Sequence, residues 1–175
     1  YENIADKATV AGVEIEIRKN LFVRPVSNAA HGMNKLSLGL NGSYIYTNAK
    51  MPLATVTTGS QLEGAAPWIV NFDLSHNFTK GERSFVNTLV LNYVSDKIYT
   101  IGTQGYQDIM EQGVLTLDFV SQAKLNKHLS LNLKARNLLN PSYKLSRKAN
   151  ENGEKVILND YKKGINISLG VSCTF

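Results

Sequence analysis

The sequence contains only one cysteine, Cys173, so no disulfide can form within the chain. Cys173 belongs to an apolar series near the end of the sequence, which indicates a small hydrophobic side chain and not a nucleophile. No run of about 20 apolar residues is present, so no membrane-spanning helix is predicted. The first residues, "YENIADKATV", also lack the basic and apolar regions of a secretory signal. Such absences are typical of a soluble cytoplasmic protein, unless the chain is the C-terminal piece of a larger one or crosses a membrane as strands.

Concentrated charge and the common site motifs are missing as well. The net charge is +5, but the lysines and arginines are scattered, so nucleic acid is not a predicted partner. No Gly-rich phosphate loop occurs, and His31, His76 and His128 are too dispersed to predict a metal site. Asp73 and Ser75 are near His76, but on a strand His76 points to the opposite side, so the three do not form a catalytic triad. We therefore predict no catalytic residue, no metal and no cofactor, and a protein that is not an enzyme.

What the sequence does contain is a repeated alternation of apolar and polar residues, the pattern of β-strands. The alternation in the fourth run is blurred, because valines interrupt its polar side. The connections at 79–83 and 126–128 are short, whereas 20–34 is long and no helix is needed beyond a turn near 106–113. Seven runs show the pattern, at residues 7–19, 35–47, 68–78, 84–102, 114–125, 129–139 (continuing to Ser146 despite Pro141) and 155–175.

Two all-β folds can bury such strands. In a soluble sandwich the apolar face is turned toward a shared core, and in a membrane barrel it is turned toward lipid. Three features favour the barrel: charges on the polar side of nearly every run, runs that reach the roughly 9 to 11 residues of a membrane strand, and long links that alternate with tight turns. On this interpretation the residues that face the lumen are Glu14, Glu16, Arg18, Asn71, Asp73, Lys134 and Arg136.

The number of strands predicts that more strands exist. An open sheet of seven strands in lipid would leave two unpaired edges, and single-chain bacterial barrels have even strand numbers. We therefore predict that residues 1–175 form the C-terminal part of a larger, antiparallel up-and-down transmembrane β-barrel. Aromatic residues near strand ends, such as Tyr44, Trp68 and Tyr93, fit interfacial girdles or ordinary β-propensity equally well.

Several segments resemble one family in the expected order. The segment "GYQDIMEQGVLTLDFVSQAKLNKHLSLNLKARNLLNPSYKL" (105–145) resembles the closing strands of TonB-dependent outer-membrane receptors, most of all the Bacteroidetes type with a carboxypeptidase-like regulatory domain. Within it, "ARNLLNPSY" is similar to the family's asparagine-leucine-leucine-asparagine box. "NIADKATVAGVEIEIRKNL" resembles a strand and periplasmic turn of the family, and Phe175 resembles the terminal signal for barrel insertion.

The resemblance implies the location, function and partners. It implies a barrel of about twenty-two strands in the Gram-negative outer membrane, which imports a siderophore complex, an oligosaccharide or a peptide. The implied partners are outer-membrane lipid, the remaining strands and plug of the receptor, a TonB-type complex acting through the plug, the barrel insertion machinery and a surface lipoprotein. A soluble ligand-binding sandwich and a small complete barrel remain as alternatives.

The resemblance also indicates which further residues matter. The nutrient would meet the external loops at 50–67, 103–113 and 147–154, where Asp108 and Glu111 are candidates for binding or for ordering the loops. Leu169, Val171 and Phe175 would form the C-terminal insertion signal.

Overall fold

The chain is built almost entirely of antiparallel strands. A computed structural model describes residues 7–26, 32–50, 61–102, 106–149 and 153–174, and strands make up 75% of them, with no helix. Among these residues, accordingly, no helix is long and apolar enough to cross a membrane. The strands are β1 (Lys7–Pro25), β2 (Met33–Lys50), β3 (Trp68–Lys80), β4 (Arg83–Val94), β5 (Lys97–Thr100), β6 (Ile109–Glu111), β7 (Val114–Lys124), β8 (Leu129–Arg136), β9 (Ser142–Lys148), β10 (Lys155–Lys162) and β11 (Asn166–Cys173).

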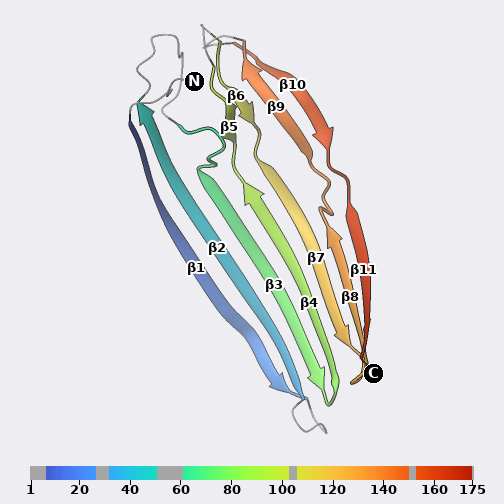
Figure 1. Cartoon of the computed structure of the whole chain (residues 1–175). Coiled ribbons are helices and arrows are strands. Elements are labelled where there is room, and N and C mark those ends of the chain that lie inside the picture. Colours follow the sequence, from blue (N-terminus) through green and yellow to red (C-terminus); the bar gives the residue numbers. More distant parts are fainter. Residues whose placement is uncertain (1–6, 27–31, 51–60, 103–105, 150–152, 175) are drawn as a thin grey trace.

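The strands form two sheets that follow one another along the same wall. The larger has the order β1-β2-β3-β4-β7-β8-β11, and the smaller has the order β10-β9-β6-β5. Each strand of the smaller sheet continues a strand of the larger one beyond a short break, as Figure 1 shows. The seven predicted runs are thus confirmed as seven long strands in an up-and-down arrangement, and the last four are each broken once.

Two connections differ from the prediction. Residues 109–111 form β6 instead of a turn, because Met110 pairs with Ile98 of β5 and with Ser146 of β9. The described part of the link predicted at 20–34 is mostly strand, because β1 and β2 stay paired down to Pro25 and Met33 across a bulge between Asn20 and Phe22. A bulge adds a residue without ending the ladder, so the alternation breaks where the pairing does not.

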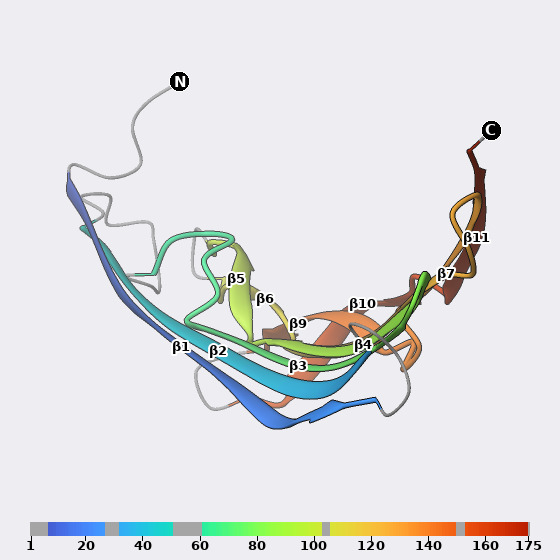
Figure 2. The same cartoon turned by 90° about the horizontal axis from the view of Figure 1, so that it is seen from below.

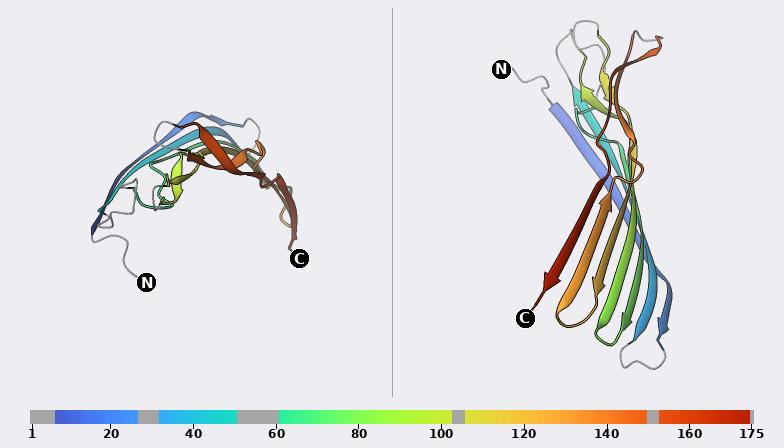
Figure 3. Two further views of the ribbon diagram at one scale, coloured as in Figure 1. Left: turned by 90° about the horizontal axis from the view of Figure 1, so that it is seen from above. Right: turned by 90° about the vertical axis from the view of Figure 1, so that its right-hand side faces the viewer.

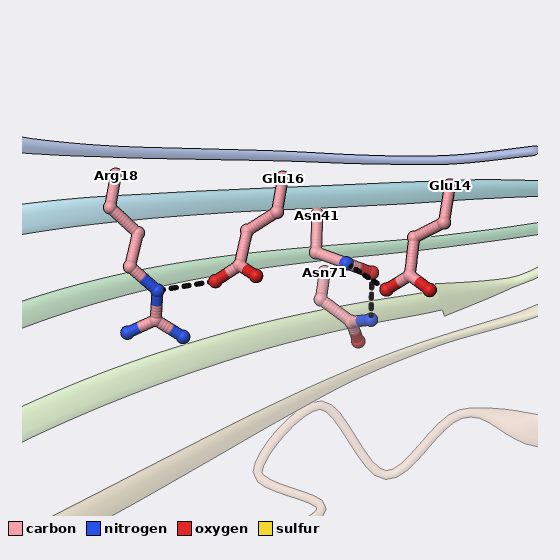
Figure 4. Close-up of polar contacts among 5 residues, drawn as sticks. All are labelled: Glu14, Glu16, Arg18, Asn41 and Asn71. Atoms are coloured by element: carbon pink, nitrogen blue, oxygen red, sulfur yellow. Dashed lines mark hydrogen bonds and ion pairs between the residues drawn. The ribbon is translucent and has the colours of Figure 1, made fainter.

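The pairing register separates polar and apolar residues onto opposite faces. One row across five strands contains Ile17, Leu40, Phe72, Leu91 and Leu117, and the adjacent row contains Glu16, Asn41, Asn71, Asn92 and Thr116. The larger sheet is curved into an open trough (Figures 2 and 3). Figure 4 shows Glu14, Glu16 and Arg18 of β1 reaching over the neighbouring strands toward the middle of the trough. The concave face is therefore polar and the convex face apolar.

The wall is a single layer. Contacts between elements follow hydrogen-bonded strand neighbours, and no sheet packs face to face on another in the part of the chain that the structure describes. On the convex face Ile15 is 62% exposed and Leu169 is 71% exposed. The dry interior that a sandwich requires is thus not found within the described ranges.

Aromatic pairs mark two levels on the convex face. Tyr44 and Trp68 have ring centroids 4.5 Å apart at one end, and Phe78 and Phe85 have centroids 6.4 Å apart at the other. Trp68 and Phe78 are ten residues apart in β3, which corresponds to about 34 Å along a strand. At the tilt of about 35–45° found in membrane barrels, that length spans about 24–28 Å, close to the roughly 25 Å apolar band of such barrels.

Candidate functional site

All seven predicted lumen residues lie on the concave face, but they form two separate groups. Glu14, Glu16 and Arg18 of β1 lie near Asn71 and Asp73 of β3. The second group, Lys134 and Arg136 of β8, is separated from β3 by β4 and β7.

A chain of side-chain hydrogen bonds crosses the first four strands. The Nδ2 atom of Asn41 donates to Glu14 Oε1 at 2.6 Å, and Asn71 Nδ2 donates to Asn41 Oδ1 at 3.3 Å, as Figure 4 shows. Asn92 Nδ2 then donates to Asn71 Oδ1. Asn41 and Asn71 each donate one bond and accept one, and Asn92 donates at the β4 end, so the chain runs without a gap from β4 to the carboxylate on β1. Asn41 and Asn92 were not predicted as site residues, because only the cross-strand register shows that they face Asn71.

A charged cluster lies beside this chain. Arg18 is paired with the Glu16 carboxylate and is 76% exposed at its side chain. Gly39 lies between Arg18 and Asp73 in the register, and the Asp73 carboxylate lies over it. A Cβ atom at Gly39 would come within 2.1 Å of Asp73 Oδ1, so only glycine leaves room for the carboxylate there. A groove of about 290 Å³ opens at this place, lined by Arg18, Lys19, Asn20, Lys35, Ser37, Leu38, Gly39 and Asp73.

The same row continues toward β8. Val90 pairs with Asp73 on one side and with Asp118 on the other. Phe119 pairs with Ala135, so Asp118 and Arg136 flank that pair on the concave face. From β1 to β8 the row thus carries Arg18, two carboxylates and Arg136, and Asn166 of β11 follows as the partner of Arg136. Val90 interrupts the row, and with Val86 on the same face it blurs the alternation of that run.

Asp118 also belongs to a polar clamp at the break between β8 and β9. Its Oδ1 accepts the Asn137 N–H at 2.8 Å, and Asn137 Nδ2 donates to the Gly164 carbonyl at 2.7 Å. The Gly164 N–H donates to Asn140 Oδ1 at 3.1 Å. Asn137 and Asn140 have φ angles of 59° and 44°, a conformation that asparagine tolerates better than most residues. The "NLLN" segment therefore joins the break in the sixth long strand to the break in the seventh.

The two loop candidates differ in their surroundings. Asp108 Oδ1 accepts the Gly102 N–H at 2.8 Å, so this carboxylate ties Gly102 to the residues just before β6. Glu111 is not in a loop, contrary to the prediction, because it pairs in β6 with Lys97 and Leu145. Its carboxylate lies 3.3 Å from Lys97 Nζ, and both side chains are less than one third exposed.

Backbone hydrogen bonds show which face Glu111 takes. In one strand, residues whose N–H and C=O groups point to the same neighbour present their side chains on the same face. Leu117 lies on the convex face, and its carbonyl accepts the N–H of Leu138, which follows β8. The Gln112 N–H donates to the carbonyl of Lys144 in β9. Both bonds therefore point to the neighbouring chain formed by β8 and β9. Gln112 therefore shares the face of Leu117, and Glu111 takes the opposite, concave side. The change of phase occurs at Gly113, whose N–H leaves the ladder and donates to Asp96 Oδ1 at 2.6 Å.

A small pocket surrounds Glu111 on this inner face. The rings of Tyr143 and Tyr161 are stacked with centroids 5.5 Å apart, and Lys163 Nζ lies 3.8 Å from the Tyr143 centroid. The tyrosines were not predicted as a site, because their strands are brought together only by pairing between β9 and β10 and between β6 and β9. The pocket has a volume of about 290 Å³ and is lined by Tyr99, Glu111, Tyr143, Leu145, Asn159 and Tyr161.

The proposed insertion signal is described in part. Leu169 and Val171 lie on the convex face of β11 and are 71% and 61% exposed. Phe175 lies outside the described residues. The segment before it is held to the turn between β7 and β8, because the Thr174 N–H donates to the His128 carbonyl at 2.9 Å.

The histidines take no part in a metal or catalytic cluster within the described ranges. No group of three or more His, Cys, Asp or Glu side chains there could hold a metal ion. His76 lies on the convex face with its Nε2 atom 2.8 Å from Asn34 Oδ1, whereas Asp73 and Ser75 lie on the concave face. The predicted opposition of His76 to these two residues is confirmed.

Comparison with known proteins gives one match. Residues 1–138, well over half of the chain, match the family model described as TonB dependent receptor-like, beta-barrel. The matched range contains the amide chain, the Arg18 cluster and the residues of β8. No curated protein and no solved structure matches the chain.

Proposed function

Because the chain belongs to the TonB-dependent receptor-like β-barrel family, whose members are outer-membrane transporters and not enzymes, we propose that it forms part of the wall of a receptor that imports a bulky nutrient into a Gram-negative cell. The observation that carries the proposal is the single-layer wall with an apolar convex face and a polar concave face. In a membrane barrel the first face contacts lipid and the second lines a watery lumen.

The wall continues beyond the strands of this chain. β1 and β11 are the edges of the larger sheet, and no further strand lies beside either in the part of the chain that the structure describes. In lipid each unsatisfied backbone group costs several kcal/mol, so both edges require partners. Residues 1–175 form the C-terminal part of a barrel that has about twenty-two strands, as the resemblance implies. The ends of the strands with the long connections face outward.

Import requires two further parts of the receptor. Family members in general have a plug domain and a TonB partner. The plug fills the lumen against the concave face, where the amide chain and the Arg18 cluster offer donors and acceptors to its polar groups. The TonB-type complex pulls the plug, and the nutrient captured outside then passes along this face. The insertion machinery reads Leu169, Val171 and Phe175.

The subgroup is inferred from the resemblance of residues 105–145, and one partner from the resemblance to the family as a whole. The receptor is of the Bacteroidetes type with a regulatory domain before its plug, and a surface lipoprotein assists it. The mass of the native polypeptide tests this domain organisation, because a receptor with a plug and a full barrel is several times heavier than the 19.3 kDa of this chain. A native polypeptide of that small mass would contradict it.

The two-faced wall can be tested with adjacent residues on one strand. Thr116 and Leu117 lie at the same depth of β7 on the concave and convex faces. In a receptor whose Cys173 is replaced by serine, Thr116→Cys and Leu117→Cys each carry a bimane label. Brominated lipid is expected to quench the label at position 117 and to leave the label at position 116 bright. Equal quenching at both positions, or stronger quenching at 116, would overturn the proposal.

A further inference from the structure

The pocket around Glu111 lies on the concave side of the described residues, and its chemistry indicates one class of ligand. Its lining residues belong to strands of the smaller sheet, and Figure 1 shows that sheet at the end of the wall where β3 begins. If the proposed orientation is correct, the pocket is at the outer mouth of the lumen, where a nutrient arrives first. The inference therefore rests on the proposed function and specifies its substrate.

Aromatic surface dominates the pocket. Tyr143 is only 9% exposed and is held in place by Tyr161 and by the Lys163 ammonium over its ring. Tyr161 and Tyr99 are 45% and 53% exposed, so their rings are available to a ligand. Rigid aromatic rings give a large contact area at a low cost in conformational entropy.

The pocket has few charged or amide side chains, and their net charge, counted with the lysine that pairs with Glu111, is close to zero. Glu111 is paired with Lys97 at 3.3 Å, so the carboxylate offers acceptor oxygens without a strong net charge. Asn159 lies opposite Leu145 in the register and adds an amide, which can both donate and accept. An anionic ferric siderophore would require a cluster of unpaired cations, and the pocket lining contains none.

From this combination we infer that the pocket binds a neutral oligosaccharide. A sugar ring has an apolar C–H face, which packs against a tyrosine ring, and adjacent hydroxyl groups, which match a carboxylate and an amide. The volume of about 290 Å³ is at the lower limit of small-molecule sites. The pocket therefore holds the end of an oligosaccharide, while the rest of the ligand extends into the lumen.

The test uses the full receptor in detergent and a panel of probes. The panel contains neutral fragments of starch, cellulose, xylan and mannan, together with a ferric catecholate and a short peptide. We expect one of the glycan fragments to bind, and Tyr161→Ala to weaken its binding at least about tenfold, which corresponds to 1.4 kcal/mol. Tyr161→Phe keeps the ring and is expected to retain binding within about twofold.

A matched control is available on the other face. Tyr46 is 46% exposed, almost the same as Tyr161, but it lies on the convex face beside Ala11. Tyr46→Ala should leave glycan binding unchanged, and a heat-dependent shift in gel migration verifies that every variant is folded. The inference is overturned if no glycan fragment binds, or if Tyr161→Ala binds the fragment as tightly as the unchanged receptor does. It is also overturned if Tyr161→Ala weakens the binding of the catecholate or of the peptide instead. The bimane labels at 116 and 117 remain unaffected by such a result, so the proposed function and its substrate class fail separately.

Discussion

The sharpest prediction concerns a lysine placed at different depths of β4. Phe85, Leu89 and Tyr93 follow one another on the convex face at intervals of four residues. Each interval corresponds to about 13 Å along the strand and about 10 Å of depth at the usual tilt. Leu89 therefore lies near the middle of the apolar band, and the two aromatic residues lie near its borders.

The expected cost follows this depth. A lysine on the lipid face costs about 2–4 kcal/mol at the bilayer midplane and about 0–1 kcal/mol near the interface. Leu89→Lys should thus lower the stability of the receptor by about 2–4 kcal/mol, and Phe85→Lys and Tyr93→Lys by at most about 1 kcal/mol each. Guanidinium unfolding of the full receptor from phosphatidylcholine vesicles measures the three values.

Val90→Lys is the control at the same depth. Val90 lies on the concave face between Asp73 and Asp118, its partners in the two adjacent strands. A lysine there gains cross-strand pairs worth roughly 0.2–1 kcal/mol each, so the variant should be as stable as the unchanged receptor or slightly more stable. A larger loss for Val90→Lys than for Leu89→Lys would show that the concave face, and not the convex face, is removed from water, and would refute the membrane orientation.

Two further predictions concern the wall itself. Gly39→Ala should destabilise the receptor by about 1 kcal/mol, because its Cβ displaces the Asp73 carboxylate, and Gly42→Ala should be neutral, because nothing lies within 4 Å of a Cβ there. Combining Gly39→Ala with Asp73→Ala should abolish the difference in a double-mutant cycle; an additive result would contradict the clash. Asn137→Ala should reduce the free energy that holds the break to Gly164 by about 2 kcal/mol. The variant loses one hydrogen bond, and alanine tolerates the positive φ angle less well than asparagine. Hydrogen exchange should then be faster in β9 and β10 than in β8, and uniform exchange would count against a local clamp.

The sequence was sufficient to predict the single-layer wall, because the alternation of apolar and polar residues along a strand shows directly which residues share a face. Glu14, Asp73 and Lys134 were assigned to the polar side from spacing alone, and the register places them there. Spacing does not, however, report neighbours across strands. The amide chain through Asn41 and Asn92 depends on which residues are opposite each other, and this is fixed only by turns and bulges.

The breaks were the part that spacing could not predict. Glu111 was assigned to a loop because it lies in the connection 103–113, between two alternating runs, where the sequence indicates at most a turn. In the structure β6 and β7 follow each other across a break of two residues, where the Asp96 carboxylate accepts the Gly113 N–H. A side chain from another strand can thus replace a ladder hydrogen bond, and no local pattern indicates this. The tyrosine pocket was missed because the pairing of β6, β9 and β10, which brings its residues together, is not visible in the spacing of any one strand.

The break at Gly113 has a consequence for how such a wall can vary. The side chains of β6 and those of β7 alternate between the two faces, but the alternation shifts by one residue at Gly113. An inserted or deleted residue in β6 or in the connection before it would rotate side chains only as far as Gly113, and the lipid-facing residues of β7 would stay in place. The lining of the mouth can therefore diversify, residue by residue, without disturbing the part of the protein that the bilayer constrains.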